Sequence, residues 1–151
     1  MADSSLEQGG LNIRNVPVAD VIGLRHQILR AGLPVETARF EGDDEPTAAH
    51  FAAFDGSRTI GCATVLQRPW NGQPAWQVRG MAVAADCRLG GIGRGLLIAI
   101  ERHVAAQNAS LLWCNARSPA VGFYKLQGWR LASEEFDIPS AGPHFKMIKD
   151  L

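Results

Sequence analysis

The sequence of 151 residues lacks any excess of charge. Its 15 Lys and Arg side chains balance 15 Asp and Glu side chains, so the formal net charge is zero with His neutral. Nucleic acids and anionic membranes are usually bound through a basic excess or a basic patch. We therefore expect no nucleic acid and no membrane among the main partners.

Long apolar runs and cysteine pairs are also missing. No window approaches the roughly 18 consecutive apolar residues of a spanning helix, and residues 1–10 lack the basic and apolar regions of a signal peptide. Cys62, Cys87 and Cys114 are widely spaced and form no CxxC pair. The sequence therefore predicts no disulfide framework and no metal site. We expect a cytoplasmic protein whose residues 1–10 are flexible.

What the chain does contain is enough apolar material for one folded domain. Hydrophobic residues make up 46% of the sequence and charged residues 20%, which is typical of a globular domain of this size. Because no repeat, low-complexity tract or linker divides the chain, we predict a single domain over residues 1–151.

Apolar periodicity and turn residues place the elements of the first half. A helix is predicted at about residues 21–30, after Pro17 and Asp20, and a loop or broken helix over the acid-, Gly- and Pro-rich residues 32–46. The predicted strands cover residues 11–16, 49–54, 59–66 and 76–83, the middle two forming a hairpin.

The second half changes to a helical period. Leu96, Ile100 and Val104 fall on one face of a helix predicted over residues 92–107. A buried strand follows at residues 111–114, then a short helix that opens at Ser118-Pro119 and ends before Gly128. Two closing strands are predicted over residues 129–136 and 144–148. This order favours a mixed α+β or α/β sheet.

The densest chemical feature is the glycine cluster over residues 88–95, RLGGIGRG, between a predicted strand and a predicted helix. Glycines allow close approach to a ligand, and the free N–H groups of a helix start bind anions. A Walker loop is excluded because the chain has no Gly-Lys pair, and the dinucleotide pattern GxGxxG fails at Leu96. A phosphate-bearing ligand of another kind, or a turn without a ligand, remains.

The pattern Arg88-x-x-Gly91-x-Gly93 resembles the pyrophosphate loop of the GNAT N-acetyltransferase superfamily. Residues 81–83, MAV, precede it as the coenzyme-binding strand of that family does. A second block, residues 115–129 (NARSPAVGFYKLQGW), is similar to the N-A-x-x-x-A-x-x-F-Y-x-x-x-G-[FW] stretch of the family. The resemblance covers residues 76–129 and implies an α+β fold (a mixed α/β sandwich) with a mostly antiparallel sheet of six to seven strands. That sheet would splay at the coenzyme A cleft, with about four helices around it.

The resemblance also implies acetyl-CoA as co-substrate and an N-acetyltransferase acting on a primary amine of a small molecule or peptide, by direct transfer in a ternary complex. Tyr124 is the implied catalytic acid, and a backbone N–H near Val83 polarises the thioester carbonyl. The implied coenzyme-binding residues are Met81, Ala82, Val83, Arg88, Leu89, Gly90, Gly91, Ile92, Gly93, Arg94, Gly95, Asn115 and Tyr124.

The base and the acceptor site stay open at this point. Residues 76–81 lack the carboxylate that some family members carry on this strand, which leaves a water relay or one of Glu36, Glu41, Glu135, Asp137 and His144.

Arg25 and Arg30 are candidates for binding an acidic acceptor, and Trp70 and His144 are further candidate acceptor contacts. The alternatives are a non-catalytic acyl-CoA-binding regulatory module and a transferase for another acyl group. Dimers are common in families like this, so a homodimer is a possible assembly.

Overall fold

The computed structural model describes residues 5–8, 11–88 and 90–151. The α-helices are α1 (Ala19–Leu29), α2 (Ile92–Ala105) and α3 (Val121–Leu126), and short 3-10 helices lie at Val35–Ala38, Ala85–Cys87 and Ser118–Ala120. The strands are β1 (Ser5–Gln8), β2 (Leu11–Val16), β3 (Ala49–Asp55), β4 (Arg58–Gln67), β5 (Trp76–Val83), β6 (Leu111–Arg117), β7 (Arg130–Leu131), β8 (Phe136–Ile138) and β9 (Gly142–Asp150). Within this part of the chain, no helix has the length and apolar character that crossing a membrane requires.

The strands form one sheet in the order β1-β2-β3-β4-β5-β6-β9-β7, with β8 also paired to β9. All of these pairs are antiparallel except β5 and β6. Two parallel neighbours need a crossover connection, and α2 supplies it. The predicted α+β class with a mostly antiparallel sheet is confirmed.

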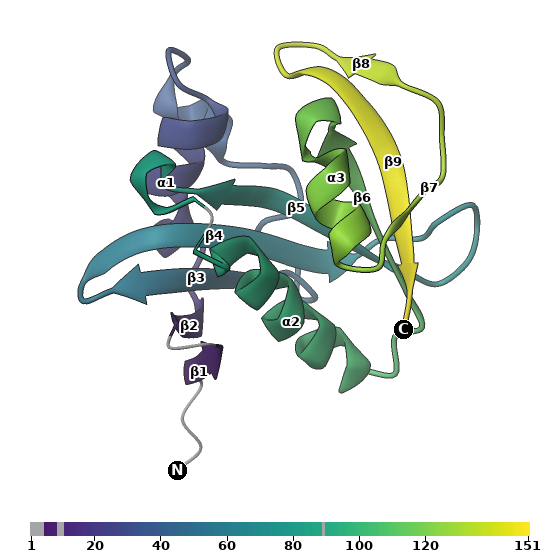
Figure 1. Cartoon of the computed structure of the whole chain (residues 1–151), viewed down its shortest axis with the longest axis horizontal. Coiled ribbons are helices and arrows are strands. Elements are labelled where there is room, and N and C mark those ends of the chain that lie inside the picture. Colours follow the sequence, from purple (N-terminus) through teal and green to yellow (C-terminus); the bar gives the residue numbers. More distant parts are fainter. Residues whose placement is uncertain (1–4, 9–10, 89) are drawn as a thin grey trace.

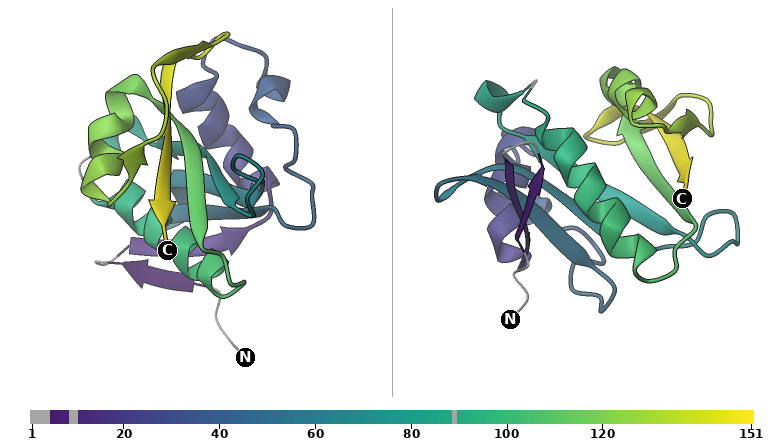
Figure 2. Two further views of the ribbon diagram at one scale, coloured as in Figure 1. Left: turned by 90° about the vertical axis from the view of Figure 1, so that its right-hand side faces the viewer. Right: turned by 60° about the horizontal axis from the view of Figure 1, so that its bottom comes forward.

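Helices cover both faces of the sheet (Figures 1 and 2). Helix α2 buries Leu96, Ile100 and Val104, each 0% exposed, against one face. Their spacing of four residues is that of one helical stripe. Helix α1 covers the opposite face, where its Arg25 reaches Thr64 of β4. The core therefore lies in two layers, one on each side of the sheet.

The sheet divides between its two parallel strands. Pairing of β5 with β6 is limited to Trp76 with Leu112, Gln77 with Trp113 and Val78 with Cys114. Beyond these residues β5 stays with β4, whereas β6 continues beside β9. Figure 1 shows the two parts of the sheet separating here, with β5 on one side and β6 and β9 on the other.

Some expected details are corrected by the structure. The sheet has nine strands in the described residues, not six or seven, because β1 was not predicted and two short strands, β7 and β8, form where one strand was expected over residues 129–136. The same residues hold three α-helices, not about four. Part of the N-terminal segment expected to be flexible, Ser5–Gln8, pairs with β2, while residues 1–4 and 9–10 lie outside the described chain.

Candidate active site

A cleft of about 410 Å³ opens where β5 and β6 separate. Its walls come from the end of α1, the middle of β5, the end of β6, helix α3 and the start of β9. Side chains of a parallel pair that stand directly opposite share a face of the sheet, so Gln77 and Trp113 mark one face and Val78 and Cys114 the other. The cleft therefore connects the α1 side of the sheet with the α2 and α3 side.

A bulge in β5 produces this separation. Cys62 of β4 pairs with Ala82 and Thr64 pairs with Arg79, so two residues of β5, Gly80 and Met81, face one residue of β4. Gly80 has φ of +61°, which residues with a side chain rarely adopt. A Cβ there would also lie 2.8 Å from Nε of Arg25. Glycine is thus required at the point where the strand turns away.

The bulge leaves one edge of β5 without a strand partner. From Arg79 to Val83 the strand pairs with β4 but not with β6, so amide groups on the second edge face the cleft. Met81 lines the cleft with its side chain, whereas Ala82 is buried and 3% exposed. An extended ligand with amide groups can bind to such an edge as an additional strand.

Beyond β5, the glycine cluster forms the start of α2. Gly91 is the N-cap residue with φ of +78°. No side chain caps the helix, and its first turn contains no Asp or Glu. The first N–H groups of a helix have no partner within it and carry partial positive charge. Arg88 and Arg94 are both exposed beside this start. The arrangement suits an anion, as predicted from the residues; Leu89 lies outside the described part.

The other glycines of the cluster differ in what they touch. A Cβ on Gly93 would lie 2.9 Å from Cζ of Phe123, so this glycine lets α2 and α3 pack closely. Gly95 is buried and its N–H donates to the carbonyl of Gly91 at 2.9 Å, the first helical bond of α2. Gly90 is exposed in the turn before the helix. Packing therefore explains part of the cluster and the free helix start explains the rest.

Tyr124 lies at the cleft on the α3 side and is 5% exposed. Its ring meets those of Phe123 and Trp129 edge to face, with centroids 5.2 and 5.3 Å away. Burial, together with the neighbouring Cys114 thiol, raises the pKa of the Tyr124 hydroxyl well above its ordinary value. The hydroxyl is therefore protonated at neutral pH, and its raised pKa makes it a weaker acid than a free tyrosine.

Asn115 and His144 line the α1 side of the cleft. Asn115 accepts a hydrogen bond from Nζ of Lys146 at 3.3 Å. His144 is 5% exposed, and its Nδ1 lies 2.7 Å from the carbonyl oxygen of Gly142. A carbonyl only accepts, so Nδ1 carries the proton and Nε2 of the neutral ring is free to accept one.

Arg25 does not contact the cleft, which corrects the expectation of an acceptor-binding role. Its side chain is 0% exposed, and its guanidinium donates to both carboxylate oxygens of Asp43 at 2.7 and 3.0 Å. Further bonds reach Thr64 Oγ1 at 2.7 Å and the Ala38 carbonyl at 3.0 Å. All of this directs Arg25 inward, where it fixes the loop after α1 to the sheet.

Trp70 is also distant from the cleft. Its ring packs on Trp113, with centroids 5.5 Å apart, beside a small cluster of Ala75, Leu111 and Ile148. The backbone of Trp70 closes the turn after β4 by pairing with Gln73. The structure shows packing for Trp70 and does not place it among the residues that line the cleft.

Of the five candidate side chains for the base, only His144 lines the cleft, and the alternative of a water relay stays open. Among the described residues no carboxylate lines the cleft. Glu41 binds Arg68 at 3.1 Å and lies 3.8 Å from Arg79, and Glu135 accepts a hydrogen bond from Ser118 at 2.8 Å. That bond also means that Ser118 does not cap the helix after it. His144 is the one candidate base that faces the cleft.

Several residues that line the cleft were not predicted from the sequence, among them Phe40 and Arg79. Phe40 follows a loop with no periodic pattern. Arg79 did give a signal, because it is the only charged residue in β5. Its pKa is lowered by burial and by the nearby charge of Arg68, which indicates a guanidinium held partly out of water.

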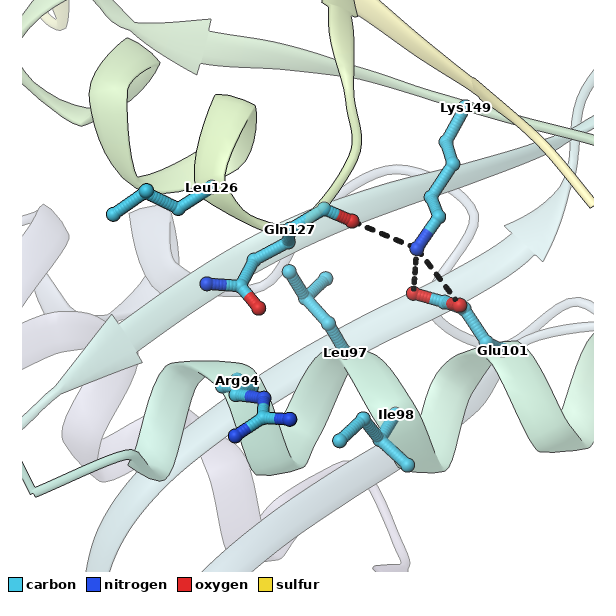
Figure 3. Close-up of a pocket in the computed structure, with 7 residues that line it drawn as sticks. All are labelled: Arg94, Leu97, Ile98, Glu101, Leu126, Gln127 and Lys149. Carbon is cyan, nitrogen blue, oxygen red and sulfur yellow. Dashed lines mark hydrogen bonds and ion pairs between the residues drawn. The ribbon is translucent and has the colours of Figure 1, made fainter.

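A second hollow of about 490 Å³ lies between α2 and the end of α3 (Figure 3). Arg94 stands at one end of it, close to the helix start. At the other end Nζ of Lys149 binds both carboxylate oxygens of Glu101 at 3.0 Å and the Gln127 carbonyl at 2.8 Å. The hollow therefore runs along α2 from Arg94 to Glu101.

Comparisons with known proteins agree with this geometry. The model of the Acetyltransferase (GNAT) family matches residues 24–129, more than half of the chain. The uncharacterized N-acetyltransferase YitI of Bacillus subtilis (strain 168) is 31% identical over 147 residues, which cover 93% of this chain and 97% of the relative.

Solved structures share the fold. A GNAT family acetyltransferase of Elizabethkingia anophelis with acetyl-CoA bound superposes with a TM-score of 0.68 at 15% identity, over 95% of this chain and 100% of that one. A GCN5-related N-acetyltransferase of Kribbella flavida gives 0.72 at 22% identity, over 93% and 98%. The chain therefore belongs to the GNAT acetyltransferase family and is an acyltransferase.

Proposed function

We propose that this protein transfers an acetyl group from acetyl-CoA to a primary amine, directly and within a ternary complex. The observation that carries the proposal is the cleft itself, which joins a free strand edge, a buried tyrosine and an uncapped helix start. Two substrates can enter this cleft from opposite faces of the sheet, which is what direct transfer requires.

The coenzyme would bind along the α2 and α3 side. Its amide-bearing pantetheine arm would pair with the free edge of residues 79–83, and its diphosphate would accept hydrogen bonds from the N–H groups at the start of α2. Arg88 and Arg94 are placed to add charge-assisted contacts. The nucleotide end would then extend past Arg94 into the hollow beside Leu126.

Acetyl transfer requires a neutral amine, a polarised carbonyl and a proton for the leaving thiolate. The amine nitrogen attacks the thioester carbon, the new C–N bond forms and the C–S bond breaks. An N–H near Val83 would stabilise the oxygen anion that develops. The departing sulfur takes a proton from the Tyr124 hydroxyl.

His144 is the proposed base. The bond from its Nδ1 to the Gly142 carbonyl fixes the tautomer and leaves Nε2 for the amine proton. The proton that His144 takes from the amine balances the proton that Tyr124 gives to the sulfur. An unperturbed alkyl amine has a pKa near 10.4 and is almost entirely protonated at pH 7, so such help matters.

The test combines coenzyme binding with release of free CoA. Acetyl-CoA should bind in isothermal titration, and a panel of amines should include one that releases thiol. Tyr124→Phe and His144→Gln should each lower turnover by about 10²- to 10⁴-fold with little change in acetyl-CoA affinity. Tyr124 is the only tyrosine in the sequence, so no second tyrosine can serve as a control. Phe123→Leu, next to Tyr124, therefore serves as the packing control.

Three outcomes are informative. Loss of turnover with retained binding supports the assigned roles. Equal turnover in Tyr124→Phe and wild type removes the acid role from Tyr124. Binding of acetyl-CoA without thiol release for any amine contradicts the transferase and indicates a coenzyme-binding module.

A further inference from the structure

Three arginines from three different elements line the α1 side of the cleft. Arg30 follows the last residue of α1, Arg79 lies in β5 and Arg117 ends β6. They are far apart in sequence, and only the separation of β5 from β6 brings them around one cavity. Within the described residues, no Asp or Glu lines that cavity.

The positive charges of these arginines have few opposite charges near them in the protein. In the described structure, neither Arg30 nor Arg117 takes part in an ion pair. Nε of Arg30 is buried without a hydrogen-bond partner, and the guanidinium lies 5.5 Å from the Phe40 ring centroid. Arg117 has one weak bond, from Nη2 to the Leu29 carbonyl at 3.4 Å.

The charge of Arg79 is partly balanced by a carboxylate. Its Nη2 lies 3.8 Å from a carboxylate oxygen of Glu41, a side chain that is 80% exposed. Arg25 provides the contrast in charge, since Asp43 is its counter-ion through two hydrogen bonds, although its Nε, like that of Arg30, is buried without a partner. Partly buried cations without an opposite charge are costly. A cluster of them around a cavity therefore indicates that a bound anion completes the site.

The coenzyme does not account for this charge. Its diphosphate has a site at the start of α2, on the opposite face of the sheet from α1. Arg117 shares the α1 face with His144, because the two residues are directly paired across β6 and β9. The charge therefore surrounds the acceptor side of the proposed reaction centre, next to the proposed base.

We propose that the acceptor is an amine that carries an anionic group, a carboxylate or a phosphate, and that Arg30 and Arg117 bind this group. The inference rests on the proposed acetyl transfer and names the class of its acceptor. Polyamines and other polycationic amines are excluded as good substrates, because they would meet three positive side chains and no carboxylate. His144 stands beside the bound anion and receives the amine.

The experiment compares amines that differ only in the anion. Ethanolamine is measured against serine and O-phosphoethanolamine, tyramine against tyrosine, and spermidine represents polycations. Thiol release gives kcat and KM for each. We expect anionic members to exceed their neutral partners in kcat/KM by at least about tenfold, and the carboxylate and phosphate arms identify which anion fits.

Variants separate charge binding from folding. Arg30→Gln and Arg117→Gln should raise KM for the anionic amine by about tenfold to a hundredfold, with acetyl-CoA affinity unchanged. Arg117→Lys should restore part of the affinity. Arg102→Gln removes the same charge from an exposed position on α2 and should change nothing.

Failure of this inference can be distinguished from failure of the proposed function. Turnover confined to neutral or cationic amines overturns the anionic acceptor and leaves acetyl transfer standing. If no amine releases thiol, acetyl transfer is contradicted, and binding of O-phosphoethanolamine and serine to the CoA-loaded protein decides the anion site. Binding that is lost in Arg30→Gln supports the site, and no binding of either compound overturns it.

Discussion

Gly61 offers a direct test of how α2 is held against the sheet. It lies buried in β4, and a Cβ placed on it would be 2.4 Å from Cγ2 of Ile92 and 3.2 Å from Cδ1 of Leu96. Carbon atoms in contact are normally about 3.5–4.0 Å apart. The Gly61→Ala variant therefore requires α2 to move at its first residue, by about an ångström.

The cost follows from this overlap. Overpacking of a core by a methyl group typically destabilises by about 1–3 kcal/mol. In a domain of this size each kcal/mol lowers Tm by about 2–4 °C, so Gly61→Ala should melt about 2–12 °C below wild type. Because Ile92 begins the helix whose N–H groups form the proposed anion site, acetyl-CoA affinity should fall as well.

A matched glycine-to-alanine control should change the stability in the opposite direction. Gly23 lies exposed in α1, and a Cβ there would meet nothing within 4 Å. Gly23→Ala should stabilise the protein by about 0.5–1 kcal/mol, since alanine favours a helix interior.

In the double variant Gly61→Ala with Ile92→Ala, the added methyl group occupies space that Ile92 leaves. The combined loss should be smaller than the sum by about 0.5–3 kcal/mol.

The assays are thermal unfolding by circular dichroism and isothermal titration with acetyl-CoA. A Tm for Gly61→Ala equal to or above that of wild type would refute the close contact between β4 and α2. Strict additivity in the double variant would refute Ile92 as the residue responsible.

Two further predictions concern buried charge. Asp43→Asn should destabilise the protein by about 3–5 kcal/mol, measured by urea unfolding, because it leaves Arg25 buried without its counter-charge; a loss under 1 kcal/mol would contradict a dominant ion pair. Stability should also fall from pH 7.5 to pH 5.5, since burial lowers the pKa values of His50 and His103 in the folded state. Below about pH 6.5 the unfolded chain binds protons that the folded chain resists, so protonation favours unfolding. His103→Gln should reduce the slope, and stability that is flat or rises toward pH 5.5 would contradict this.

Local patterns predicted much of the scaffold. The strand over residues 76–83 and the first strand over residues 11–16 coincide with β5 and β2, and α2 begins at the predicted residue. Each of these elements has an apolar period of its own. The strand β1 was not predicted, and the single strand expected over residues 129–136 is two short strands, β7 and β8, because each of the three is held by hydrogen bonds to a neighbouring strand.

The sequence by itself determined the family resemblance, the glycine-rich start of α2 and the position of Tyr124 on a short helix, because these depend on residues that are close together in the chain. The tertiary structure alone decided which arginine side chains are buried in the core and which line the cleft. Arg25 and Arg30 lie five positions apart on or just after one helix, yet one turns into the core toward Asp43 and the other faces the cleft. That difference depends on which loop and which strand pack against each residue, and such long-range contacts are not encoded in any local pattern.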